Sequence, residues 1–226
     1  MFTRILTSAL FAGAAAGLLI ALMQYIFVQP VLLHAELYEG GDLVHFGAAP
    51  VSASQNLPGF DPVRDLLSVM FTMLVYCGYA LGLVALMSIA QERGAVITPT
   101  NGMIWGVAGF VAAHLAPGFS LAPEVPGVAA ADVAARQMWF FPTVAAAVAA
   151  MWLLAFHRNA MGIAAAVVLL AAPHLIGAPE PDTFAGPVPT ELGALFAARA
   201  LGVGLAAWVI LGTLCAYFWS SEAEAA

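Results

Sequence analysis

The chain of 226 residues is 63% hydrophobic and only 8% charged, and its formal net charge is −7. Soluble domains carry roughly 25% charged residues, and a soluble fold cannot hide so much apolar surface, because much of its surface stays exposed. The composition excludes a soluble protein, and the acidic balance argues against nucleic-acid binding and for attraction of cations. We expect an integral membrane protein in which residues 1–226 form a single transmembrane domain.

Apolar segments of helix length follow one another along the chain. A helix needs roughly 17–25 apolar residues to cross a hydrocarbon core about 30 Å thick. The segments that qualify are residues 5–28, 66–90, 101–117, 138–156, 160–176 and 192–219. The third and fifth are short, so a hydropathy scan that drops one of them reports five. The sequence predicts an all-α, polytopic membrane protein with about six transmembrane helices, arranged as three helical hairpins.

Glycines and aromatic residues indicate how these spans pack and end. Glycine pairs four residues apart, a spacing that suits close helix contacts, occur at Gly13/Gly17, Gly78/Gly82 and Gly102/Gly106. Aromatic residues gather at span ends, as at Trp139 and Phe140. We interpret them as an interfacial belt.

The connections between the spans alternate in character. Residues 29–65, 118–137 and 177–191 are long, acidic and rich in proline, whereas residues 91–100 and 157–159 are short and carry Arg93 and Arg158. Together with Arg4, the short connections predict a multi-pass membrane protein with cytoplasmic termini. Counting arginine alone gives a tie, because an equal number lies on the other side. Those arginines each open a span beside an acid, and we expect interfacial snorkelling or ion pairing; the pairs are Arg64 with Asp65, Arg136 with Asp132 and Arg199 with Glu191.

A histidine recurs where an apolar run gives way to a long connection, at His34, His114 and His174. A polar side chain at this depth is costly unless it is paired or faces a cavity, so a functional role is the default hypothesis. Pro117 and Pro173 lie beside the second and third of these histidines and are expected to break the helices and free carbonyl groups. Broken helices line ion sites in transporters. The alternative is a histidine that bonds a freed carbonyl for packing alone.

Carboxylates accompany each of these histidines. Glu36 lies two residues after His34, while Glu124 and Glu180 have a proline on one or both sides, which favours an extended backbone. Imidazole with carboxylate suits cobalt, nickel and zinc, although the residues follow no regular ligand spacing, and a solvated acidic loop is the alternative. The predicted metal ligands are His34, His114, His174, Glu36, Glu124 and Glu180.

The same stretches resemble a known family. They run from His114 to Gly127, from Ala135 to Trp139 with Thr143, and from Pro173 to Pro181, and similar features occur at Phe2 to Ile5, Gly13 to Gly17 and Pro30 to Glu36. Together they cover essentially the whole chain and resemble the CbtA family of predicted cobalt transporter subunits in bacterial inner membranes. The chain departs from the family pattern at Phe140, where a second tryptophan is typical, and at Arg199.

The resemblance implies a role in metal supply for cobalamin and a small one-helix partner, CbtB, with a His-rich terminus. It also implies that His34, His114 and His174 belong to the shared pattern. The chain shows no nucleotide-binding loop, nucleophile elbow or metalloprotease motif, so we expect neither an enzyme nor a tightly bound cofactor.

The leading interpretation is a permease subunit for cobalt, nickel or zinc; the alternative is a non-transporting membrane scaffold or metal chaperone that hands metal to a partner subunit. The expected partners are the lipid bilayer, the divalent ion, the CbtB-like subunit and a second copy of the chain, and nucleic acid is not among them.

Overall fold

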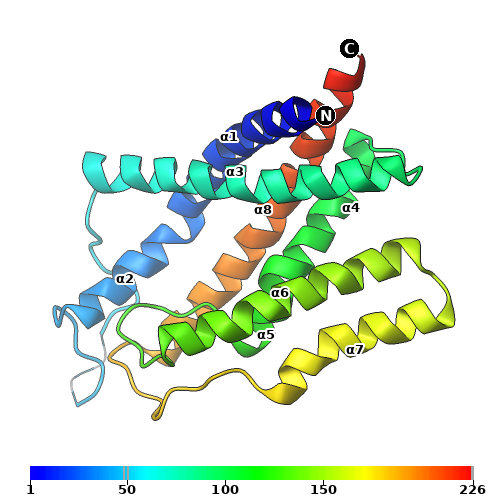
Figure 1. Cartoon of the computed structure of the whole chain (residues 1–226). Helices are drawn as coiled ribbons and strands as arrows, with labels where there is room; N and C mark the ends of the chain where they lie inside the picture. Colours follow the sequence, from blue (N-terminus) through cyan, green and yellow to red (C-terminus); the bar gives the residue numbers. More distant parts are fainter. Residues whose placement is uncertain (48, 50, 225–226) are drawn as a thin grey trace. The chain divides into compact units, whose positions relative to one another are not determined.

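The computed structural model describes residues 1–47, 49 and 51–224. Every regular element in these residues is a helix, as the sequence predicts (Figure 1). In chain order they are α1 (Phe2–Phe27), α2 (Gln29–Glu39), α3 (Pro62–Glu92), α4 (Pro99–Phe110), the π-helical η1 (Val111–Leu115), α5 (Ala116–Ser120), α6 (Val133–Phe156), α7 (Ala160–Ile176) and α8 (Thr190–Glu224).

Within the described residues, five helices are long and apolar enough to cross a membrane. They are Phe2–Phe27, Pro62–Glu92, Pro99–Ser120, Val133–Phe156 and Thr190–Ser221. The remaining apolar helix, Ala160–Ile176, has 17 residues, which corresponds to about 26 Å at a rise of 1.5 Å per residue. The structure is therefore that of a polytopic helical membrane protein, but helix length alone does not confirm the predicted six spans.

The chain folds into two compact units, and each is built from more than one stretch of the sequence. Unit 1 comprises Met1–Phe27, Gly59–Phe110 and Gly202–Ala226, and unit 2 comprises Val28–Pro58 and Val111–Leu201. The single transmembrane domain remains a prediction.

Unit 1 is built on close approaches between helix backbones. A Cβ atom added to Gly13 of α1 would overlap the backbone of Cys77 in α3, and one added to Gly106 of α4 would overlap the Trp208 carbonyl in α8. Gly17 and Gly102 make equally close approaches, so two of the three predicted glycine pairs are confirmed. The third, Gly78/Gly82, is wrong as a contact, because a Cβ at either position would meet nothing within 4 Å.

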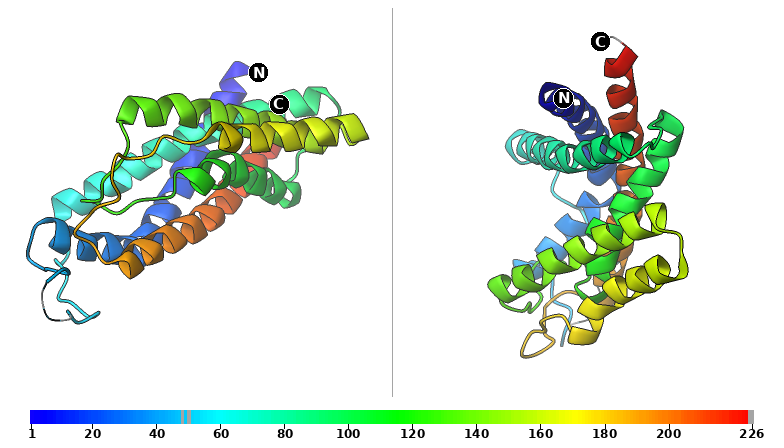
Figure 2. Two further views of the ribbon diagram at one scale, coloured as in Figure 1. Left: turned by 90° about the horizontal axis from the view of Figure 1, so that it is seen from below. Right: turned by 45° about the vertical axis from the view of Figure 1, so that its right-hand side comes forward.

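Unit 2 contains a helical hairpin and a layer of packed connections. Helices α6 and α7 run side by side, joined by a short turn (Figure 1, Figure 2). Asn159 caps α7, since its side chain accepts a hydrogen bond from the Gly162 amide at 2.8 Å. The long connections pack against α2 and the start of α8 through a small apolar core of Ala35, Tyr38, Val125 and Val188. The amide of Ala129 also donates to the carbonyl of Ala185 at 2.7 Å, so these segments are tied together.

Two expectations about proline are corrected by the structure. Residues 29–65 are not an irregular connection throughout, because α2 begins directly after α1 and Pro30 occupies its first turn, where a missing amide N–H costs nothing. The predicted helix breaks are also absent from the described chain: α7 continues through Pro173. Before Pro117 the helix widens into the π turn η1 and then resumes as α5.

Candidate functional site

The polar chemistry of the chain is concentrated in unit 2. All five histidines of the sequence lie in its residue ranges, as do eight of the 13 acidic residues. Every predicted metal ligand is among them. Both cysteines, Cys77 and Cys215, lie in unit 1. All the imidazole groups and most of the carboxylates therefore lie in unit 2, and both thiols lie in unit 1.

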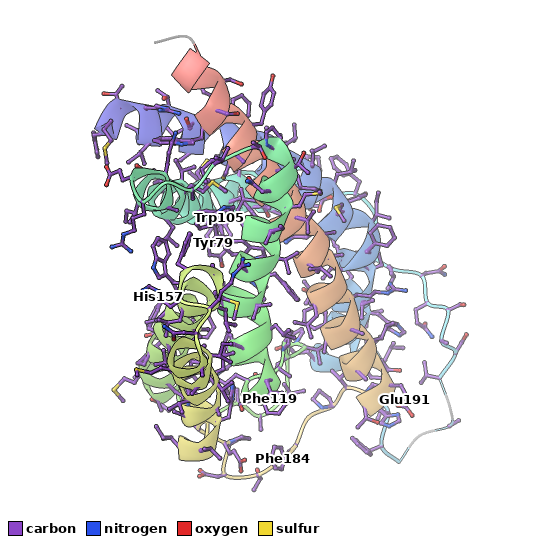
Figure 3. The ribbon with its side chains drawn as sticks, turned by 90° about the vertical axis from the view of Figure 1, so that its right-hand side faces the viewer. Tyr79, Trp105, Phe119, His157, Phe184 and Glu191 are labelled. Atoms are coloured by element: carbon purple, nitrogen blue, oxygen red, sulfur yellow. The ribbon has the colours of Figure 1, made fainter. Side chains whose placement is uncertain are left out.

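His174 is held by three helices of unit 2. Its Nδ1 lies 2.8 Å from the Ser120 hydroxyl oxygen at the end of α5. The Phe119 ring, labelled in Figure 3, contacts the imidazole edge-on at 5.0 Å between centroids, and the Trp139 ring of α6 does so at 5.7 Å. Trp139 also donates its indole N–H to the carbonyl of Pro173, the residue before His174, at 3.0 Å. These contacts hold both the orientation of the His174 ring and the backbone directly before it.

The Ser120 contact bears on which nitrogen of His174 can bind an ion. A histidine that binds metal through one nitrogen commonly donates a hydrogen bond from the other, and this partner fixes the tautomer. When Nδ1–H donates to Ser120, Nε2 carries the lone pair. The site then presents one imidazole nitrogen as a ligand.

His34 lies in the middle of α2 and stacks on Tyr38, with ring centroids 5.7 Å apart. Its Nε2 is buried and has no hydrogen-bond partner among the described residues. Leaving a buried polar atom unpaired costs roughly 1–3 kcal/mol. His34 therefore has an unmet bonding capacity that a ligand can satisfy.

His114 lies in the π turn η1 and is half-buried. A π turn lacks the regular helical spacing and occurs frequently at functional sites. His114 therefore lies where the helix is distorted, as expected, but the distortion is a π turn and not a break.

The three carboxylates differ in their surroundings. Glu124 forms a salt bridge with Arg136 at 3.2 Å, and their side chains are 35% and 32% exposed. Glu36 and Glu180 are exposed. The predicted partner of Arg136 was Asp132, but Asp132 caps α6 instead, accepting a hydrogen bond from the Ala135 amide at 3.0 Å.

Another of the three predicted pairs is present in unit 1, where Arg64 contacts Asp65 at 2.8 Å. The carboxylate of Asp65, like that of Glu124, is thereby paired with an arginine.

The described residues contain no group of three or more His, Cys, Asp or Glu side chains arranged to hold one metal ion. The structure does bring two predicted ligands to one helix: Trp139 contacts His174, Arg136 contacts Glu124, and these two partners lie three residues apart on α6, a spacing that shares one helix face. Ser120 and Tyr38 were not predicted as site residues, although Ser120 lies in a stretch that carries the family resemblance. Trp139 was given no role at the site and was interpreted as an interfacial aromatic.

Comparison with known proteins agrees with the resemblance read from the sequence. A family model, CbtA, described as a probable cobalt transporter subunit, matches residues 2–220. Comparison with curated proteins and with solved structures found no significant match. Because the match covers nearly the whole chain, the protein belongs to the CbtA family of probable cobalt transporter subunits.

Proposed function

We propose that this chain is the membrane-spanning permease subunit through which cobalt, or a similar divalent ion such as nickel or zinc, crosses the bacterial inner membrane. Family membership supplies the class of function. The observation that carries the assignment to particular residues is the buried Nε2 of His34 in α2, the helix that follows the first span, which has no hydrogen-bond partner among the described residues. A neutral imidazole nitrogen is a good ligand for these ions.

A contact in unit 1 supports six crossings. The guanidinium of Arg4, near the start of α1, stacks on Trp219, near the end of α8. If α1 and α8 both span the bilayer, this contact joins two span ends at the same membrane face, and termini on one face require an even number of crossings. Five long helices make an odd number, so we count Ala160–Ile176 as the sixth span, with local bilayer thinning to accommodate its length.

Six crossings also bring the three histidines to one membrane face. Helix α1, the helix from Pro99 to Ser120 and helix α7 then run in the same direction through the bilayer. His34 follows the first, and His114 and His174 lie near the ends of the other two. All three are therefore at the face opposite the termini. With cytoplasmic termini, an ion from outside meets them first.

In the proposed mechanism the ion loses its hydration shell in steps. The acidic connections raise the local cation concentration, and Glu36, Glu124 and Glu180 supply carboxylate oxygens. His34, His114 and His174 each replace a water by an imidazole nitrogen, while other waters remain bound. The membrane potential favours entry, since moving two charges through 100 mV contributes about 4.6 kcal/mol. The CbtB-like subunit would receive or deliver the ion.

Uptake of radioactive cobalt tests this assignment. Cells that express the chain, with and without the one-helix partner, should accumulate cobalt above the level of cells that lack it. The double substitution His114→Ala, His174→Ala and the single substitution His34→Ala should each remove most of this uptake. His157→Ala is the matched control, because His157 is exposed in the α6–α7 turn (Figure 3).

The outcomes distinguish the permease hypothesis from the metal-chaperone hypothesis. Unchanged cobalt uptake in the histidine variants would contradict the assignment of His34, His114 and His174 as ion ligands. Purified chain in proteoliposomes that captures cobalt and the partner subunit, yet passes no ion, would instead establish the membrane metal chaperone.

A further inference from the structure

A cavity of about 780 Å³ lies in unit 1, where the start of α1 meets the ends of α3 and α8. Its walls include Thr3 and Arg4 from α1, Ser88, Gln91 and Glu92 from α3, and Trp219 from α8. All three helices are candidate membrane spans, so their shared ends lie at a membrane–water interface. The cavity is distinct from the histidines and carboxylates of unit 2.

Arg4 is fixed at the wall of this cavity. Its guanidinium carbon lies 3.8 Å from the centroid of the Trp219 ring, and one terminal nitrogen donates to the Trp219 carbonyl. Trp219 is 3% exposed and is itself held by a hydrogen bond from its indole N–H to the Gln91 side-chain oxygen at 2.6 Å. The Nε of Arg4 is buried and unpartnered among the described residues. The arginine is therefore ordered while part of its donor capacity is unused.

A second, opposite charge lines the same cavity. Glu92 is exposed and ends α3. Neither Arg4 nor Glu92 takes part in the salt bridges described above, which join Arg64 to Asp65 and Arg136 to Glu124. A ligand that satisfies both walls therefore carries an anionic and a cationic group. An inorganic phosphate would leave Glu92 without a partner and would be repelled by it.

We propose that this cavity binds the headgroup of a phosphatidylethanolamine lipid, with the phosphate at Arg4 and the primary ammonium at Glu92. Arginine donors match phosphate oxygens, and an ammonium has N–H groups to donate to carboxylate and amide oxygens. Pockets between helix ends at the membrane surface are suited to lipid headgroups. Exposed apolar residues that adjoin lining residues in sequence, Phe2, Leu6 and Ile89, offer a surface for the acyl chains.

Native mass spectrometry of the purified chain tests the proposal. The protein is equilibrated with equal amounts of phosphatidylethanolamine, phosphatidylcholine and phosphatidylglycerol, and the bound lipids are counted. We expect phosphatidylethanolamine to be retained preferentially. Arg4→Gln should weaken its retention about tenfold, as for the loss of one charge-assisted hydrogen bond. Glu92→Gln should abolish the preference over phosphatidylglycerol, because the repelling carboxylate is gone.

Arg93→Gln is the matched control, since Arg93 follows Glu92 directly but does not belong to the cavity wall. Equal losses in Arg93→Gln and Arg4→Gln would overturn the proposal in favour of general surface charge, and so would equal retention of the three lipids. Free phosphoethanolamine is added in a separate arm; if it displaces the lipid at similar concentration, the ligand is the free zwitterion and the lipid assignment is wrong. Each variant is first checked for unchanged thermal unfolding. These measurements do not involve cobalt, so they stand or fall separately from the transport proposal.

Discussion

The two units use different kinds of contact. In unit 1, helices approach through glycine until backbone meets backbone, as at Gly13 against Cys77 and Gly106 against Trp208. In unit 2, the contacts of two predicted ligands are made by rings and charged side chains, around His174 and between Glu124 and Arg136. The glycine contacts of unit 1 leave no room for an added atom. The ring and charge contacts of unit 2 position groups that can change partners. We infer that unit 1 serves mainly as a scaffold and unit 2 carries the ion chemistry.

Substitution at a close approach in unit 1 should have the largest effect on stability. Gly106→Ala adds a methyl group that overlaps the carbonyl of Trp208 and must push α4 from α8. We expect a loss of about 3 kcal/mol in the free energy of unfolding, as for severe overpacking. Thermal or denaturant unfolding in detergent measures this loss.

Gly78→Ala is the control, since a Cβ there meets nothing within 4 Å, and alanine favours the helix by about 1 kcal/mol. Equal stability of the two variants would contradict the scaffold role of the α4–α8 contact.

Substitution in unit 2 should instead change ion binding more than folding. Ser120→Ala removes the hydroxyl that holds Nδ1 of His174 at 2.8 Å. We expect cobalt affinity to fall about tenfold, the lower end of the range for lost partners of metal-binding histidines. Titration of the purified protein with Co²⁺, followed by its absorption spectrum, measures both affinity and ligand geometry.

A conservative variant separates positioning from packing. Ser120→Thr keeps the hydroxyl and should restore both affinity and spectrum. In a His174→Ala background, Ser120→Ala should have no further effect, because the two residues act as one unit. An additive effect there would show that Ser120 acts independently of His174.

Hydropathy and small-residue spacing predicted much of the fold, because both depend on local sequence. The six predicted segments overlap the helices Phe2–Phe27, Pro62–Glu92, Pro99–Ser120, Val133–Phe156, Ala160–Ile176 and Thr190–Ser221. Gly13 and Gly78 stand in identical patterns, yet only Gly13 meets a neighbouring backbone, since the pattern does not say which helix face has a partner. Helix α2 was missed because residues 29–65 are rich in proline and were interpreted as a connection, whereas Pro30 lies in the first turn of a helix, where proline is tolerated.

The site was less accessible to prediction from the sequence. His174 could be selected because a histidine in an apolar run is costly. Ser120 and Trp139 could not, since their role depends on three helices meeting at one imidazole. The predicted partner of Arg136, Asp132, was also wrong, because Arg136 forms its salt bridge with Glu124. Asp132 is nearer in sequence, but the start of α6 uses it as a cap.

The smallest predicted effect concerns this last pair and tests whether Glu124 is an ion ligand. If Glu124 is a ligand, the Arg136 guanidinium that contacts its carboxylate competes with the metal for it. Because both side chains are about one third exposed, the pair contributes only about 0.5 kcal/mol. Arg136→Gln should therefore tighten cobalt binding by about twofold, and Glu124→Gln should weaken it. In the Glu124→Gln background Arg136→Gln should change nothing, and Arg158→Gln serves as the charge control. Weaker binding in Arg136→Gln alone would instead mean that the salt bridge holds unit 2 in its binding conformation, and that Glu124 acts through structure and not as a ligand.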